Sequence, residues 1–195
     1  MYDYLKGQVE SLTPTEAVIE CAGIGFNILI SLQTYEALSG KSEAKVYVHH
    51  YLREDDEQFY GFATKDEREL FRLLITVSGV GVGSARMMLL SMGDEELREA
   101  IIAENVHKIK SIKGIGIKTA QRIILDLKDK IIKGSGSGQS SVATNSNSAA
   151  AEEAATALVL LGFTRASVNK VLPEIIKALP GAKVEDIIKA ALQKL

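Results

Sequence analysis

The first 63 residues contain short runs rich in hydrophobic and β-prone side chains, broken by polar turns. Gly23-Ile24-Gly25 and Ser39-Gly40-Lys41 are two of these turns, and residues 53–57 form an acidic one. Several short antiparallel strands so close in sequence are typical of a small barrel, and an OB-fold is the leading candidate. We expect the strands at residues 4–12, 16–21, 25–30, 45–52 and 58–62.

The pattern changes at Lys65, where hydrophobic residues begin to recur at helical spacing, as in Leu70, Leu73, Leu74 and Val77. Residues 64–133 are therefore expected to be wholly helical. Two segments of this region, 77–85 and 112–120, align without a gap when one is shifted by 35 positions. Each has an apolar residue, any residue, glycine, an apolar residue, glycine, three further residues and alanine.

The duplicated segment predicts a tight hairpin between two helices, made twice. Its glycines tolerate a positive φ and let an anion approach the backbone, while Ala85 and Ala120 let the second helix pack closely. A helix N-terminus presents unpaired N–H groups and a partial positive charge, which suit a phosphate. An ordinary helix corner with a glycine cap is the alternative for each copy. Neither G-x-G-x-x-G nor a Walker A sequence is present.

The segment 134–148 carries no charged side chain and is rich in glycine and serine. Such a composition predicts a flexible tether with a reach of roughly 20 Å. Residues 149–195 follow as three short helices, at 149–161, 165–179 and 184–195. A bundle this small exposes part of its apolar surface, as a docking module does, although a self-contained bundle is the alternative.

Charge is unevenly distributed along the chain, whose net charge is -2. Residues 1–63 hold 4 lysine and arginine residues against 10 acidic ones, whereas residues 64–133 hold 13 against 10. The helical region thus leans towards a polyanion. The single Cys21 fits a reducing compartment, and the chain has no signal-peptide pattern or apolar run long enough to span a bilayer, so we expect a cytoplasmic protein.

The order of these parts resembles the RuvA family, whose members recognise Holliday junctions for the bacterial branch-migration machine. The resemblance rests on the barrel with its 51–55 turn and its 59–62 closing strand, the paired hairpins, the tether and the small helical domain. It implies an α+β multidomain fold: an OB barrel (1–63), tandem helix-hairpin-helix motifs (64–133), a linker (134–148) and a three-helix, UBA-like domain (149–195).

The resemblance also implies a flat fourfold tetramer that holds the four DNA arms by backbone contacts and reads junction shape instead of base sequence. Glu54 and Asp55 match the family's acidic pin, whose carboxylates would repel phosphates by about 1 kcal/mol per pair of charges 4 Å apart in water. A solvated turn is the alternative for these two. The DNA contacts are expected at Gly79, Gly81, Gly83, Ser84, Arg86, Gly114, Gly116, Lys118, Thr119 and Arg122.

Two positions depart from the family pattern, because Gly83 and Ile117 stand where lysine is expected. Backbone amides should then carry more of the phosphate attraction, with Lys118, Arg122 and either Arg86 or Lys113 in support. We expect a shallower dependence of affinity on salt than in relatives with the full basic set.

The family's C-terminal domain binds RuvB, a hexameric ATPase motor, and the matching apolar positions are Leu158, Leu161 and Leu192. The RuvC resolvase and further copies of this chain, up to an octamer on DNA, are the other expected partners. No catalytic residue, metal or cofactor is expected. A nuclease subunit would need clustered carboxylates that hold a divalent metal, and single-strand binding by the barrel is opposed by its acidic charge.

Overall fold

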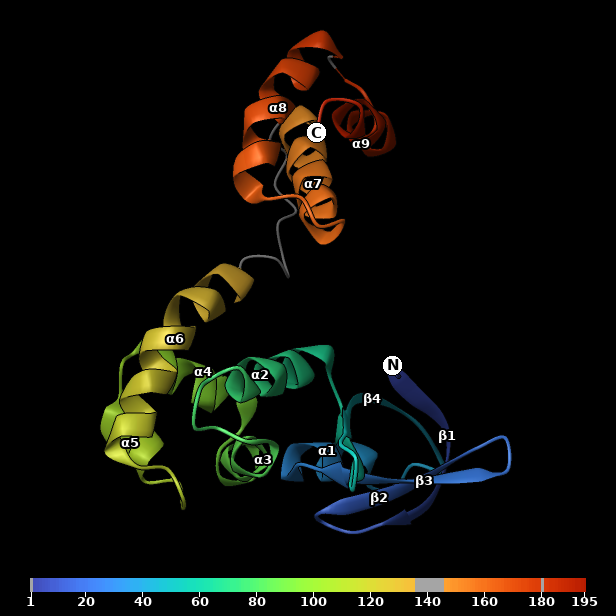
Figure 1. Cartoon of the computed structure of the whole chain (residues 1–195). Helices are drawn as coiled ribbons and strands as arrows, with labels where there is room; N and C mark the ends of the chain where they lie inside the picture. Colours follow the sequence, from blue (N-terminus) through green and yellow to red (C-terminus); the bar gives the residue numbers. More distant parts are fainter. Residues whose placement is uncertain (1, 136–145, 180) are drawn as a thin grey trace. The chain divides into compact units, whose positions relative to one another are not determined.

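A computed structural model describes residues 2–135, 146–179 and 181–195 of the chain. The chain divides into two compact units, Met1–Gly138 and Gln139–Leu195 (Figure 1). Most of the tether predicted at 134–148 lies outside the described residues. At its two ends the chain is helical, because α6 (Ile117–Ser135) runs to Ser135 and α7 (Ser146–Leu160) begins at Ser146.

The first unit opens with a closed barrel whose strand order among the described residues is β1-β2-β3-β5-β4. The strand pairs are antiparallel except for β3 and β5, which run parallel with Ile28 opposite Phe59. The OB-fold is confirmed, but the expectation that every strand is antiparallel is wrong, because the barrel closes through this parallel pair. The strands are β1 (Tyr4–Leu12), β2 (Glu16–Cys21), β3 (Ile24–Ile30), β4 (Glu43–Leu52) and β5 (Glu57–Phe62).

A short helix, α1 (Leu32–Leu38), connects β3 to β4 and was not expected from the sequence. Ser31 caps it by accepting a hydrogen bond from the Thr34 N–H at 3.0 Å. Leu38 joins the barrel core, which alternate strand residues such as Ile19, Ile28 and Val46 fill. The helix therefore adds an apolar side chain to the core and brings the polar Ser31 and Thr34 to the edge of the barrel.

The remainder of the first unit is helical, as expected. Two helix pairs, α2–α3 and α5–α6, form the hairpins, and α4 connects them (Figure 1). Their shared core continues onto the barrel, since Phe71 of α2 lies 5.1 Å from the ring of Tyr60 and 5.0 Å from that of Phe62, both on β5. These helices are α2 (Lys65–Ile75), α3 (Val82–Ser91), α4 (Asp94–Ile102), α5 (Val106–Lys110) and α6.

A buried carboxylate crosses the seam between the barrel and α2. Glu67 is 1% exposed, and its carboxylate accepts hydrogen bonds from the Ser31 hydroxyl and, at 3.1 Å, from the Thr34 hydroxyl. Burial raises the pKa of the Glu67 carboxyl, although both hydroxyls oppose the rise. Beside it, Arg68 donates to the carbonyl and carboxylate oxygens of Asp3, each at 2.6 Å. These bonds attach the first hairpin to the barrel.

The second unit is a three-helix bundle within the described residues, as expected. Its core contains Ala154 and Leu158 from α7, Val168 and Leu172 from α8 (Arg165–Ala178), and Ile187 from α9 (Val184–Leu192). Across the described residues of both units, no helix combines the length and apolar character needed to cross a membrane.

Candidate nucleic-acid interface

The two hairpin turns have the same backbone geometry. In the first, the Val80 N–H donates to the Val77 carbonyl at 3.0 Å, and in the second the Ile115 N–H donates to the Ile112 carbonyl at 3.1 Å. The glycine between each pair has a positive φ, +92° at Gly79 and +89° at Gly114. A side chain at either glycine would place its residue in a strained region, so the motif requires glycine there.

The helix after each turn begins in the same way. The first bond closed in α3 runs from the Ala85 N–H to the Gly81 carbonyl, and its counterpart in α6 runs from Ala120 to Gly116, both at 2.9 Å. Ala85 and Ala120 are fully buried, as expected for small residues at a close contact of each second helix. The backbone N–H groups that precede Ala85 and Ala120 in each helix have no carbonyl partner within the helix, and Gly81 and Gly116 at these two ends are exposed to solvent.

Charge at these helix ends favours an external anion. The first turns of α3 and α6 hold only neutral or basic side chains, whereas Asp94, Glu95 and Glu96 occupy the first turn of α4. The positive end of α4 is thus compensated by its own carboxylates, but the ends of α3 and α6 are not. Each of these two helix N-termini follows an exposed glycine turn and has no acidic side chain of its own, so each is suited to hold an anion such as a phosphate.

The side chains around the two turns differ strongly. Gly83 in the first hairpin matches Lys118 in the second when the duplicated segments are aligned, and Ser78 matches Lys113 in the same way. Both lysines are exposed and, among the described residues, neither makes an ion pair. Arg122 is exposed as well, with its Nε 3.9 Å from the Asp126 carboxylate. Ser84 and Thr119 are half-buried at matching positions.

Arg86 lies differently from the other predicted contacts. It is half-buried, and its Nη2 donates to the carbonyl oxygen of Thr15 in the barrel at 2.6 Å. From the sequence, Arg86 was expected to act together with Lys118 as a cation that attracts DNA phosphates. The structure instead brings its guanidinium against the barrel.

The predicted acidic pin occupies the turn between β4 and β5. The Arg53 N–H donates to the Asp56 carbonyl at 2.8 Å and closes the turn, which leaves Glu54 and Asp55 exposed at its tip. Glu57 is directed back to the strands, where its carboxylate lies 2.8 Å from His50 Nε2. The free charge at the tip therefore comes from Glu54 and Asp55, while Asp56 is half-buried.

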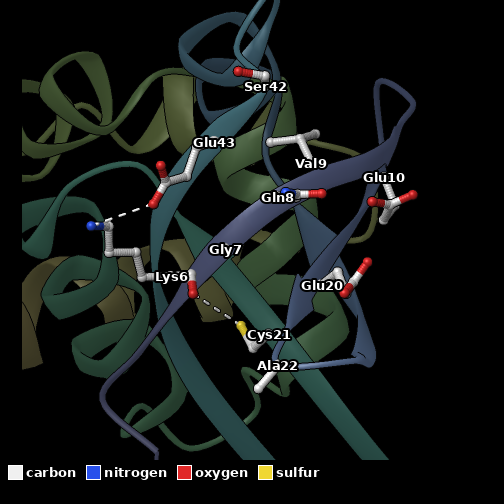
Figure 2. Close-up of a pocket in the computed structure, with 10 residues that line it drawn as sticks. All are labelled: Lys6, Gly7, Gln8, Val9, Glu10, Glu20, Cys21, Ala22, Ser42 and Glu43. Atoms are coloured by element: carbon white, nitrogen blue, oxygen red, sulfur yellow. Dashed lines mark hydrogen bonds and ion pairs between the residues drawn. The ribbon is translucent and has the colours of Figure 1, made fainter.

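A polar hollow of about 670 Å³ opens on another part of the barrel, beside β1 and β2 (Figure 2). Glu10, Glu20 and Glu43 line it together with Lys6, whose ammonium is 3.4 Å from Glu43. Cys21 also lines it, half-buried, and its thiol donates to the Lys6 carbonyl at 3.2 Å. The residues predicted to bind DNA lie elsewhere. Within the described part of the chain, no cluster of side chains is suited to hold a metal ion.

The apolar positions predicted to dock a motor separate into two groups. Leu158 is fully buried in the bundle core, so its side chain cannot reach a partner, and its place in the predicted docking set is corrected. Leu161 and Leu192 are 60% and 45% exposed. Leu160, at 83% exposed, was missed. The helical period of α7, with Ala154, Ala155 and Leu158 inside, could have placed it outside.

Three family models match successive parts of the chain. They are the RuvA N terminal domain at residues 1–61, the SAM-like helix-hairpin-helix tandem at 71–129 and the RuvA C-terminal domain at 149–195. The hairpins described above lie within the second of these matches.

Similar proteins extend the match over the whole chain. Proteins of Christiangramia forsetii, Bacteroides fragilis and Flavobacterium psychrophilum are 50%, 46% and 44% identical to it. Each alignment covers 100% of this chain and 100% of the relative. Each relative is named Holliday junction branch migration complex subunit RuvA.

Proposed function

This chain belongs to the RuvA family, and from that membership we propose that it binds four-way junction DNA as a subunit of a branch-migration complex. The observation that carries the proposal is the pair of equivalent helix N-termini at Gly81 and Gly116. Each offers backbone amides and an uncompensated dipole to a phosphate. Contacts of this kind position DNA without reading its bases. Recognition then depends on the shape of the junction.

The DNA contacts in this proposal are the amides around Gly79, Gly81, Gly114 and Gly116, with Gly83 and Ser84 in the first turn of α3. Lys118 and Arg122 add charge at the second hairpin, together with Thr119 and the exposed Lys113. Because lysines flank the turn of the second hairpin and not that of the first, most of the counterion release at the two turns comes from the second.

The acidic tip has its role at the centre of an assembly of four chains. Glu54 and Asp55 are exposed and free of ion pairs among the described residues, so their full charge faces whatever approaches the tip. Four such tips around one axis would repel the phosphates at the crossover and keep the junction open. In this proposal the acidic tip of the barrel separates the DNA strands at the crossover, and the hairpins bind the duplex arms of the junction.

The C-terminal bundle is proposed to recruit the RuvB motor through the exposed leucines Leu160, Leu161 and Leu192. Leu161→Asp should remove stimulation of the motor ATPase and leave junction binding unchanged, since the two functions reside in different units. Loss of both activities would instead indicate a misfolded chain. Leu158→Asp is the matched control, because it places the same charge at a buried leucine and should unfold the bundle.

A gel-shift assay tests the proposal directly. A four-way junction, a linear duplex of the same arm sequence and a single strand would be titrated with the full chain, and then incubated with Mg²⁺. We expect the junction to bind at least tenfold more tightly than either competitor and to remain uncut. Cleavage would favour a nuclease, and preference for the single strand would favour binding by the barrel. Native mass spectrometry of the complex would count the chains.

A further inference from the structure

Arg86 joins the first hairpin to the barrel at one defined point. Its Nη2 donates to the Thr15 carbonyl at 2.6 Å, and the same oxygen accepts the backbone N–H of Ile30 at 3.0 Å. Thr15 lies between β1 and β2, and Ile30 is the last residue of β3. The guanidinium therefore makes a charge-assisted hydrogen bond to the barrel at the point where the ends of β1, β2 and β3 lie together.

The acceptor is held firmly in its own turn. The Thr13 N–H donates to the Glu16 carbonyl at 2.8 Å, and the Glu16 N–H donates to the Thr13 hydroxyl at 3.0 Å. Among the described residues, Arg86 Nε is buried without a hydrogen-bond partner, so the inner part of the side chain is enclosed by protein. A side chain enclosed in this way has little freedom to swing towards a phosphate.

Arg86 lies close to the N-terminus of α3, so its bond to Thr15 can hold that helix end in place. It is four residues after Val82, the first residue of α3, and so lies one turn from the helix end that receives the phosphate. The matching residue in the second hairpin is Gln121, which is exposed on α6. The anchor thus belongs to the first hairpin alone.

We propose that Arg86 is a positioning residue. It fixes the phosphate-binding N-terminus of α3 relative to the barrel and so sets the preference for a junction over linear duplex. The inference rests on the proposed function, because it concerns how the hairpins and the tip at Glu54 and Asp55 are spaced. A single duplex needs only the hairpin amides. A junction also needs a fixed distance between the N-terminus of α3 and the acidic tip. If α3 were loosened, this fixed distance would be lost while the amides could still bind a duplex.

The alternative is that Arg86 contacts a phosphate through its remaining N–H groups. The two roles give different salt dependences. A residue that neutralises one phosphate contributes about 0.9 to the slope of log affinity against log salt on every DNA. A positioning residue leaves the slope unchanged and alters the ratio of junction to duplex affinity.

The test measures binding of a four-way junction and of a matched duplex at several salt concentrations, for the unaltered chain, Arg86→Gln, Arg86→Lys and Lys118→Gln. For Arg86→Gln we expect duplex affinity within about twofold of the unaltered chain, an unchanged slope, and a junction preference reduced about fivefold. Arg86→Lys, which can still donate to the Thr15 carbonyl, should recover most of the preference. Lys118→Gln should lower the slope on both DNAs and leave the preference intact.

Two outcomes overturn the proposal. A slope reduced on both DNAs in Arg86→Gln, by about 0.9 for each bound chain, would make Arg86 a phosphate contact, and an unchanged preference would make the anchor irrelevant to recognition. If Arg86→Gln fails to fold, Arg86→Met takes its place with the same two readouts, because methionine keeps the buried stem and cannot donate to the Thr15 carbonyl. Absence of any junction preference in the unaltered chain would instead contradict the proposed function.

Discussion

The two hairpins share a backbone and differ in their surroundings. The first docks on the barrel through Phe71, Glu67 and Arg86, and its turn has glycine and serine where the second has lysine. The second packs against α4, away from the barrel strands, and exposes Lys113 and Lys118. A duplicated motif has thus retained its geometry while its side chains diverged. The first hairpin is bonded to the barrel, and the turn of the second carries exposed lysines.

The largest expected effect concerns the docking of the first hairpin. Phe71→Ala removes a fully buried ring that contacts Tyr60 and Phe62 on β5, and should lower the free energy of unfolding by about 3–5 kcal/mol. Amide exchange would show where stability is lost. We expect faster exchange in both β5 and α2.

Ile123→Ala is the matched variant in the second hairpin, where a fully buried side chain of α6 is truncated. It should speed exchange in α5 and α6 and leave the barrel protected. Equal loss of barrel protection in the two variants would contradict the claim that only the first hairpin is anchored there.

The next effect tests what the hairpins share. Gly79→Ala and Gly114→Ala each force a side chain into a positive φ, at a cost of about 1–2 kcal/mol in the free energy of unfolding. No atom lies within 4 Å of the new Cβ in the described structure, so conformational strain is the whole cause. Urea unfolding would measure it.

Gly83→Ala is the control, because Gly83 has an ordinary helical φ and an alanine there should stabilise α3 by up to about 1 kcal/mol. A clear difference between Gly79→Ala and Gly114→Ala would mean that the two turns are less alike than their hydrogen bonds indicate.

A smaller effect concerns pH and the seam between α2 and the barrel. Burial raises the pKa of the Glu67 carboxyl above its ordinary value of 4.5. The protonated form is therefore favoured in the native state, and its contribution to stability is full below pH 4.5 and lost as the pH rises through the raised pKa. Glu67→Gln stays neutral at every pH, so it should lack this loss.

Between pH 4.5 and neutrality, the free energy of unfolding of the unaltered chain should fall relative to that of Glu67→Gln. A constant difference between Glu67→Gln and the unaltered chain across this range would show that the carboxyl titrates alike in the folded and unfolded states.

Much of the fold could be predicted from the sequence, because hydrophobic spacing reports local structure directly. The strands and the hairpin glycines lie close to where the pattern placed them. The exception in the barrel is α1, which has only seven residues and too few turns to show a helical period. The parallel pairing of β3 with β5 was also missed, since a pattern along one strand does not identify its neighbour.

The side chains of the site were less predictable, because their roles depend on contacts that are distant in sequence. Arg86 is bonded to Thr15, 71 residues away, and nothing near either residue signals the contact. Leu158 and Leu161 belong to one apolar run, yet only the tertiary packing of α7 separates the buried leucine from the exposed one. Glu67 was overlooked for the same reason, as its partners Ser31 and Thr34 belong to another element.

The turn of the second hairpin carries lysines where the turn of the first carries glycine and serine, and exchanging two matched residues tests most directly whether this difference in charge affects DNA binding. Gly83 and Lys118 occupy equivalent positions, and a Cβ added at Gly83 meets no atom within 4 Å in the described structure. The measurement is the slope of log affinity for a four-way junction against log salt. For each chain bound to the junction, it should become shallower by about 0.9 in Lys118→Gln and steeper by about 0.9 in Gly83→Lys, and it should return to its original value in the double variant. Slopes that stay the same in both single variants would contradict the claim.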